Sequence, residues 1–73
     1  MTRVEHGLKV VAYSGNEVVV RQRVKILDDE GNLIKAPIIE VREKKRNDRE
    51  SLEDVKKRAE KLLEQKLREM MRG

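Results

Sequence analysis

The stretch GLKVVAYSGNEVVVRQRVKIL, residues 7–27, contains two runs of largely alternating apolar and polar side chains on either side of a turn. Alternation with a period of two is typical of a β-strand that buries one face. Gly15 and Asn16 tolerate the positive φ values of a tight turn. The sequence therefore predicts an antiparallel hairpin, with strands at about 7–13 and 17–27 and a three-residue loop, Ser14-Gly15-Asn16.

A second turn follows directly. Asp28-Asp29-Glu30-Gly31-Asn32 suits a type I turn closed by a glycine bulge, another three-residue loop. It predicts a third strand at about 33–43. Pro37 lacks a backbone N–H, which places this strand at a sheet edge or places a bulge at Pro37. We therefore expect a meander in which the second strand is central.

After the strands the apolar period changes from two to between three and four. Residues 42–50 are almost wholly charged and predict a linker. From Ser51, a candidate N-cap with Asp54 three positions later, the pattern predicts a helix over about 51–72. Its apolar stripe consists of Leu52, Val55, Ala59, Leu62, Leu63, Leu67 and Met70. This stripe should cover one face of the sheet, giving an α+β fold: a three-stranded antiparallel β-meander with one long C-terminal α-helix (βββα).

Three-residue loops at both turns would fix which residues share a sheet face, and a change of one residue in loop length would exchange the faces. The face predicted to lie under the helix carries Leu8, Val10, Ala12, Val18, Val20, Val24, Ile26, Ile34, Ala36 and Ile38. The face predicted to point outward carries Lys9, Val11, Tyr13, Val19, Arg21, Arg23, Lys25, Lys35, Ile39 and Val41.

Two charged helix positions receive specific predictions. Lys66 projects near the centre of the apolar stripe, and we expect it to extend past the sheet's end toward Asp28, Asp29 or Glu30. Arg58 lies four residues after Asp54, the spacing of a stabilising ion pair within a helix.

The composition argues against a catalytic or metal-binding site. A chain of 73 residues suffices for one domain, residues 1–73. It has no cysteine and one histidine, His6, so we expect no enzyme, metal site, cofactor or small-molecule substrate. Residues 1–7 do not read as a signal peptide and no apolar run is long enough to span a membrane, which predicts a cytoplasmic or recombinant protein. Charged residues make up 44% of the chain, but the net charge is only +4 because both signs are present. This composition resembles that of a thermostable protein's surface.

Basic residues form one candidate binding feature. Alternate positions on the second strand, together with neighbours on the other strands and in the linker, would form a cationic stripe that attracts phosphates. The candidate nucleic-acid contacts are Lys9, Arg21, Arg23, Lys25, Lys35, Arg42, Lys44, Lys45 and Arg46. The layout is similar to that of integrase arm-binding and AP2-type DNA-binding domains. The alternative is a solvated face whose charges oppose aggregation.

Apolar residues among those predicted to point outward form a second candidate feature. Such a patch on a small protein suggests a protein partner, either another protein or a second copy of the chain. The candidate interface residues are Val11, Tyr13, Val19, Ile39 and Val41.

The segments SLEDVKKRAEKLLEQKLREM, residues 51–70, and DDEGNL, residues 28–33, resemble those of computationally designed sheet-plus-helix proteins. This resemblance implies a de novo scaffold. We therefore expect a non-catalytic module that serves as a scaffold or binds proteins, including itself. The alternative is a small basic DNA- or RNA-binding protein from a thermophile or phage.

Overall fold

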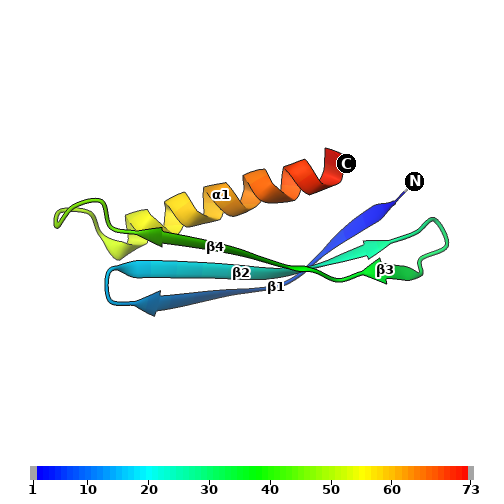
Figure 1. Cartoon of the computed structure of the whole chain (residues 1–73), viewed down its shortest axis with the longest axis horizontal. Coiled ribbons are helices and arrows are strands. Elements are labelled where there is room, and N and C mark those ends of the chain that lie inside the picture. The colour runs from blue at the N-terminus through cyan, green and yellow to red at the C-terminus, as the bar shows by residue number, and fades with distance from the viewer. Residues whose placement is uncertain (1, 73) are drawn as a thin grey trace.

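The chain forms an antiparallel sheet with one helix packed on it (Figure 1). The computed structural model describes residues 2–72, with side chains as far as Met70. Its elements are β1 (Arg3–Ser14), β2 (Glu17–Leu27), β3 (Leu33–Lys35), β4 (Ile38–Lys44) and α1 (Leu52–Arg72). The predicted α+β class is confirmed, and β2 is the central strand. Within residues 2–72, no helix is both long enough and apolar enough to cross a membrane.

The predicted third strand is divided at Ala36 and Pro37. β3 and β4 both pair with β2, and β1 pairs with β2 along the opposite side. The carbonyl of Pro37 still accepts a hydrogen bond from the Val24 N–H, at 3.0 Å, so the ladder continues through the break. Pro37 therefore lies at a sheet edge, as predicted, and interrupts the strand because it has no N–H.

The turn between β2 and β3 has the predicted form. The Gly31 N–H donates to the Asp28 carbonyl at 3.1 Å, and the Asp28 N–H donates to the Asn32 carbonyl at 2.9 Å. Gly31 has a φ of +84°, the left-handed conformation that a glycine bulge requires. The Asp28 carboxylate also accepts hydrogen bonds from the backbone N–H groups of Glu30 and Asn32.

The first turn is shorter than predicted. Ser14 pairs directly with Glu17, so the loop has two residues, Gly15 and Asn16. Gly15 has a φ of +59° and Asn16 does not have a positive φ, the pattern of a type II′ turn. Because this loop is one residue shorter, β1 presents its opposite face to the helix.

The two faces of the predicted third strand are exchanged for a different reason. Leu27 pairs with Leu33, but Ile26 pairs with Lys35, which leaves Ile34 as an extra residue in β3. This bulge shifts all of β4 by one position. Leu8, Val10, Ala12 and Ile38 were predicted to lie under the helix but lie on the outer face, whereas Val11, Ile39 and Val41 face the helix. The predictions for Val18, Val20, Val24 and Ile26 in β2 were correct.

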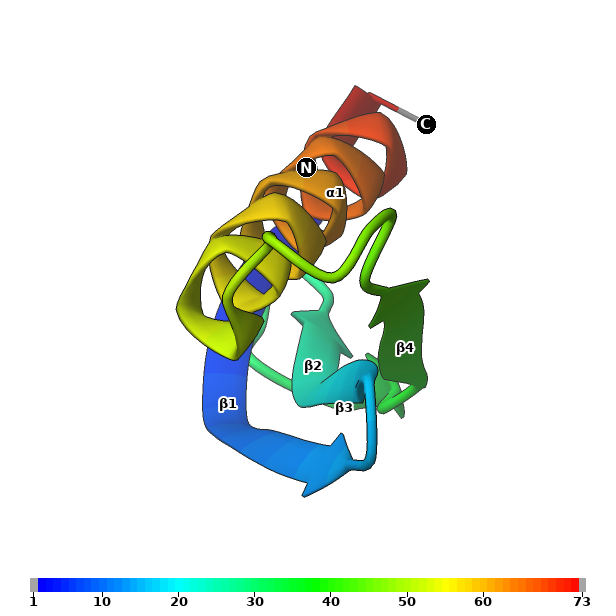
Figure 2. The same ribbon diagram turned by 90° about the vertical axis from the view of Figure 1, so that its left-hand side faces the viewer.

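The core lies between β2, β4 and α1, in the curve of the sheet (Figure 2). The buried helix residues are Val55, Ala59, Leu63 and Leu67, with Leu52, Leu62 and Met70 partly buried beside them, so the predicted stripe is confirmed. They meet Val18, Val20, Val24 and Val41. Full burial of each Val or Leu contributes roughly 1.5–3 kcal/mol, and all of these residues are aliphatic.

Side chains from α1 occupy the free edge of β4. At the two ends of β4, the Lys45 N–H donates to the Asn16 carbonyl and the Pro37 carbonyl accepts from the Val24 N–H. Odd-numbered residues of β4 therefore direct their backbone groups toward β2, and even-numbered residues direct theirs away from the sheet. Lys66 donates to the Glu40 carbonyl at 3.3 Å, and Arg58 donates to the Lys44 carbonyl at 2.7 Å. The prediction that Lys66 reaches the Asp28 turn was therefore wrong.

Arg58 also joins the helix to the linker. Its guanidinium contacts the carboxylate of Glu50 at 2.5 Å and that of Glu43 at 3.1 Å, instead of the predicted Asp54. Glu50 in turn accepts a hydrogen bond from the Arg46 N–H at 2.8 Å. These two contacts hold the pKa of Glu50 below its usual range, the bond from Arg58 having the larger effect. The Asp54 N–H donates a hydrogen bond to Ser51 Oγ at 3.1 Å, which confirms the predicted N-cap.

Candidate protein-binding surface

A bulge in β1 shapes the outer face of the sheet. His6 pairs with Val24 and Lys9 pairs with Gln22, so Gly7 and Leu8 together oppose one residue, Arg23. A Cβ atom on Gly7 would lie 3.0 Å from the Arg23 carbonyl oxygen, which explains why glycine suits this position. Gln22 Nε2 donates to the Gly7 carbonyl at 3.2 Å and holds the bulge in place. Leu8 projects from this bulge with 79% of its surface exposed.

Leu8 has two exposed apolar neighbours. Val10 lies opposite Arg21 and Ile38 lies opposite Arg23, and they are 50% and 56% exposed. We call Leu8, Val10 and Ile38 the outer patch. Its three side chains line one shallow hollow of about 280 Å³, together with Arg21, Gln22 and Arg23. The outer patch is therefore continuous and lies on the face that α1 does not cover.

Charged groups at one side of the outer patch are paired. Arg21 contacts Glu40 at 2.6 Å, and Arg42 contacts Glu40 at 3.1 Å and Glu17 at 3.2 Å. The bonds from Arg42 and then Arg21 lower the pKa of Glu40, so this carboxylate stays charged among the cations. The cationic stripe is thus interrupted by Glu40 of β4 and Glu17 of β2.

Three cations of the outer face form no ion pair within the described part of the chain. Arg23 and Lys25 occupy alternate positions of β2, and Lys44 lies on the same face of β4. Within residues 2–72, none of these three side chains has an ion pair or hydrogen-bond partner. Arg23 lies beside the outer patch, and the other two lie farther along the sheet in opposite directions.

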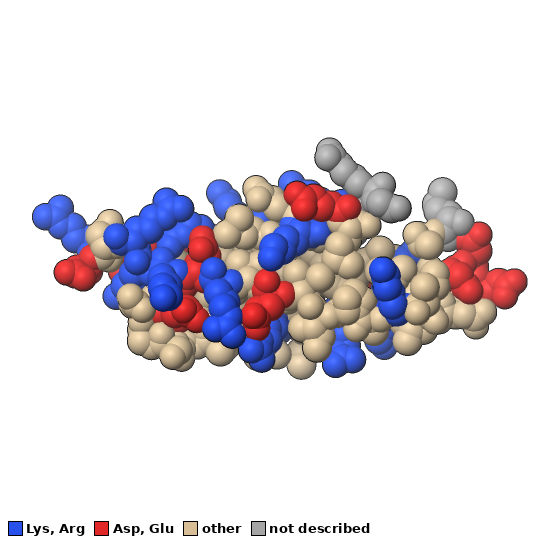
Figure 3. All heavy atoms as spheres, in the orientation of Figure 1, with Lys and Arg blue, Asp and Glu red and all other residues tan. Residues whose placement is uncertain are grey.

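The remaining predicted nucleic-acid contacts are dispersed. Lys9 lies on the helix side, where its ammonium contacts Glu60 at 2.6 Å and lowers the pKa of that carboxyl. Lys35 is opposite Ile26, also on the helix side. Lys45 and Arg46 belong to the segment between β4 and α1. Basic side chains gather near this end of the molecule, with acidic ones among them (Figure 3).

The predicted apolar interface does not form. Val11, Ile39 and Val41 pack in or against the core because the register of β1 and β4 differs from the prediction. Tyr13 is 51% exposed but lies on their side of the sheet, opposite Val18. Val19 alone is on the outer face, and it is 9% exposed. The outer patch was missed, although an isolated glycine inside a strand pattern, here Gly7, is a known signal of a bulge.

No group of three or more His, Cys, Asp or Glu side chains within residues 2–72 is arranged to hold a metal ion. Comparisons with protein-family models, curated proteins and solved structures each gave no match. The case for a function therefore depends on the surface itself.

Proposed function

We propose that this protein is a non-catalytic protein-binding module whose outer patch docks a partner with apolar side chains surrounded by carboxylates. The observation that carries the proposal is the continuity of Leu8, Val10 and Ile38, each at least half exposed, on the sheet face opposite the helix. Protein interfaces combine an apolar centre with a polar rim, and contiguous exposed apolar surface marks such sites. The outer patch with its neighbouring arginines has this composition.

The charges favour an acidic partner over a second copy. Arg23, Lys25 and Lys44 supply positive charge on the outer face, and none of them forms an ion pair with a described side chain. A twofold dimer formed through this face would place two copies of the same surface against each other, each with more cations than carboxylates. Carboxylates on a different protein would instead pair with these cations and increase the association rate.

A selection from randomised displayed peptides tests this chemistry directly. Peptides enriched on the immobilised protein should combine aliphatic or aromatic residues with Asp or Glu. One enriched peptide is then synthesised. The Leu8→Glu variant of the protein should bind this peptide at least about tenfold more weakly, because the new carboxylate repels those of the peptide. Fluorescence anisotropy measures each affinity.

Leu33→Glu is the matched control, because Leu33 is also exposed, at 58%, but lies on β3 outside the outer patch. Its effect should stay below about threefold. Equal losses for both variants, or enrichment without acidic residues, would contradict the proposal. Sedimentation should give a monomer mass; a dimer that Leu8→Glu dissociates would assign the outer patch to a second copy instead.

Nucleic-acid binding is the second candidate function, favoured by the alternation of Arg23 and Lys25 on the exposed face of β2. Two observations rank it lower. Glu40 and Glu17 would repel phosphates beside Arg21 and Arg42, and the outer patch would place aliphatic groups against a charged backbone. Tyr13, the one aromatic residue, lies on the helix side and cannot stack with bases on the outer face.

Titration with DNA and RNA at two salt concentrations distinguishes this second function. Phosphate binding should weaken steeply between about 50 mM and about 200 mM salt. It should weaken further in an Arg23→Ala, Lys25→Ala double variant, whereas Arg21→Ala should matter less because Glu40 already holds Arg21. The absence of binding at the lower salt concentration would remove nucleic acid as a ligand.

A further inference from the structure

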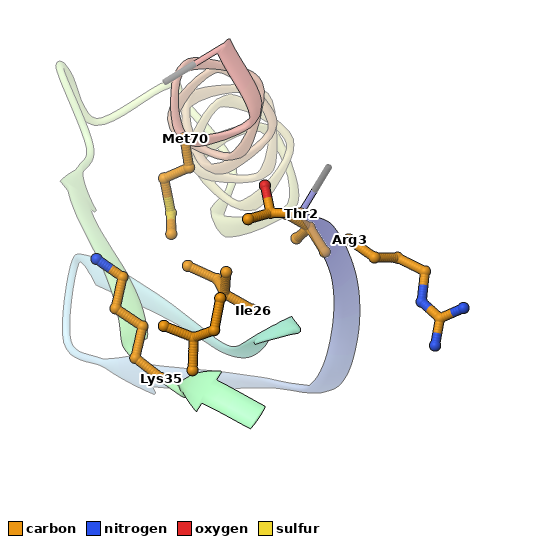
Figure 4. A pocket seen from close by; sticks show the side chains of 7 residues that line it. Thr2, Arg3, Ile26, Lys35 and Met70 are labelled. Atoms are coloured by element: carbon orange, nitrogen blue, oxygen red, sulfur yellow. The ribbon is translucent and has the colours of Figure 1, made fainter. Parts of the chain in front are cut away.

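A second apolar hollow, of about 510 Å³, lies at the opposite end of the molecule from the β4–α1 linker. It is formed where β1 begins, β2 ends and α1 approaches its last turn (Figure 4). We propose that this hollow binds a single-chain amphiphile that carries one carboxylate, such as a fatty acid. The site is separate from the outer patch, so this inference does not depend on the proposed function.

The hollow exists because the core is not closed at this end. The bulge at Ile34 directs an extra apolar side chain out of the regular pairing, and β3 is only three residues long. Ile34 is 54% exposed, while Val4, Ile26 and Met70 are half-buried. Met70 extends from α1 toward Ile26 across the opening (Figure 4). An alkyl chain here would cover apolar surface that the protein leaves partly exposed.

One cation borders the hollow in a position to meet a ligand's head group. Lys35 lies along one side, with its ammonium at the rim (Figure 4). Within residues 2–72 this ammonium has no ion pair or hydrogen-bond partner. Arg3 also lines the hollow, but its guanidinium points away from it and contacts Glu5 at 3.7 Å. A single available positive charge favours a ligand with a single negative charge.

The shape and composition agree with this ligand class. Ligand pockets typically enclose about 300–1,000 Å³, with mostly apolar walls and a few polar groups that orient the ligand. Here the walls are Val4, Ile26, Ile34 and Met70, and Lys35 is the orienting group. The hollow is open to solvent on one side, which suits a charged head group that remains hydrated while its tail is buried.

Dodecanoate, kept below its micelle-forming concentration, is the probe. We expect it to shift the methyl NMR signals of Ile26, Ile34 and Met70 and to leave those of Leu8, Val10 and Ile38 unchanged. Lys35→Met should weaken its binding about three- to tenfold, because the charged hydrogen bond to the carboxylate is lost. Dodecanol, which has the same chain and no charge, should bind the parent protein correspondingly more weakly.

Lys25→Met is the matched control. It removes the same charge from an exposed strand position on the other face of the sheet, and it should change dodecanoate binding less than twofold. Equal losses for the two lysine variants, equal binding of dodecanol, or shifts centred on the outer patch would each overturn the proposal. So would the absence of shifts, or a concentration-dependent dimer whose formation protects Ile34, since a second copy would then cover the hollow.

Discussion

Gly7→Ala tests whether the bulge depends on close contact between two strands. Gly7 does not have a positive φ, so alanine can adopt its backbone conformation without strain. Such a replacement usually stabilises a protein, by about 0.4–1 kcal/mol, because it restricts the unfolded chain. Here the new Cβ would lie 3.0 Å from the Arg23 carbonyl oxygen and 3.3 Å from the Arg23 Cβ. The sign of the effect therefore depends on whether Arg23 can move.

The neighbours of Arg23 indicate that it cannot move freely. β2 is paired on both sides, and the next residue, Val24, is buried and donates to the Pro37 carbonyl. Forcing extra volume into a packed position typically costs about 1–3 kcal/mol. After the gain from the unfolded state is subtracted, we expect a net destabilisation of about 1 kcal/mol, or a fall in Tm of about 4–8 °C.

Urea unfolding followed by circular dichroism measures this difference. Leu8→Ala, the adjacent exposed position, is the control and should stay within about 0.5 kcal/mol of the parent. If Gly7→Ala is as stable as the parent or more stable, the inference that the bulge depends on close backbone approach is refuted. If Gly7→Ala lowers the stability but leaves the Leu8 NMR signals unshifted, the close contact at Gly7 stabilises the fold without determining the position of Leu8.

Three further predictions concern the helix. Leu63→Ala should lower the free energy of unfolding by about 2–5 kcal/mol, because Leu63 is 3% exposed in the core; a loss below 1 kcal/mol, measured by urea unfolding, would contradict this packing. Ser51→Ala should cost about 1 kcal/mol by removing the cap on the Asp54 N–H, whereas Ser51→Asp should retain the stability; equal melting temperatures for parent and Ser51→Ala would show that the cap contributes nothing. The pKa of Glu50 is lower in the folded protein than in the unfolded chain, so its stabilisation is complete above the usual carboxyl pKa of about 4.5 and is lost as pH falls through the folded value. Urea midpoints should therefore fall less steeply with acidification in Glu50→Gln than in the parent, and parallel curves would argue against the contact with Arg58.

The sequence was most informative where local rules act alone. The helix could be predicted from its cap and its apolar period, and the second turn from Asp28 and Gly31, because these features depend on neighbouring residues. The edge position of Pro37 followed from its missing N–H. The central strand was also assigned correctly, since Val18, Val20 and Val24 alternate whatever the loop lengths.

The faces of β1 and β4 could not be read in the same way. Both strands carry apolar residues on both faces, such as Val10 beside Val11 and Ile38 beside Ile39. One residue in the first loop, and one bulge at Ile34, decide which face is buried. The candidate surface was missed for this reason, because its residues had been assigned to the core.

The side chains on the margin of β4 have a consequence for how far copies of this protein can associate. Lys66 and Arg58 occupy outward-facing carbonyls of Glu40 and Lys44, which an incoming strand would need. Among the described strands, β1 then has the longest margin left to recruit another chain, because β3 on the other side spans only three residues. Strand-by-strand growth would then stop after two molecules join, so even concentrated protein should resist forming amyloid-like fibres, as thioflavin fluorescence can report.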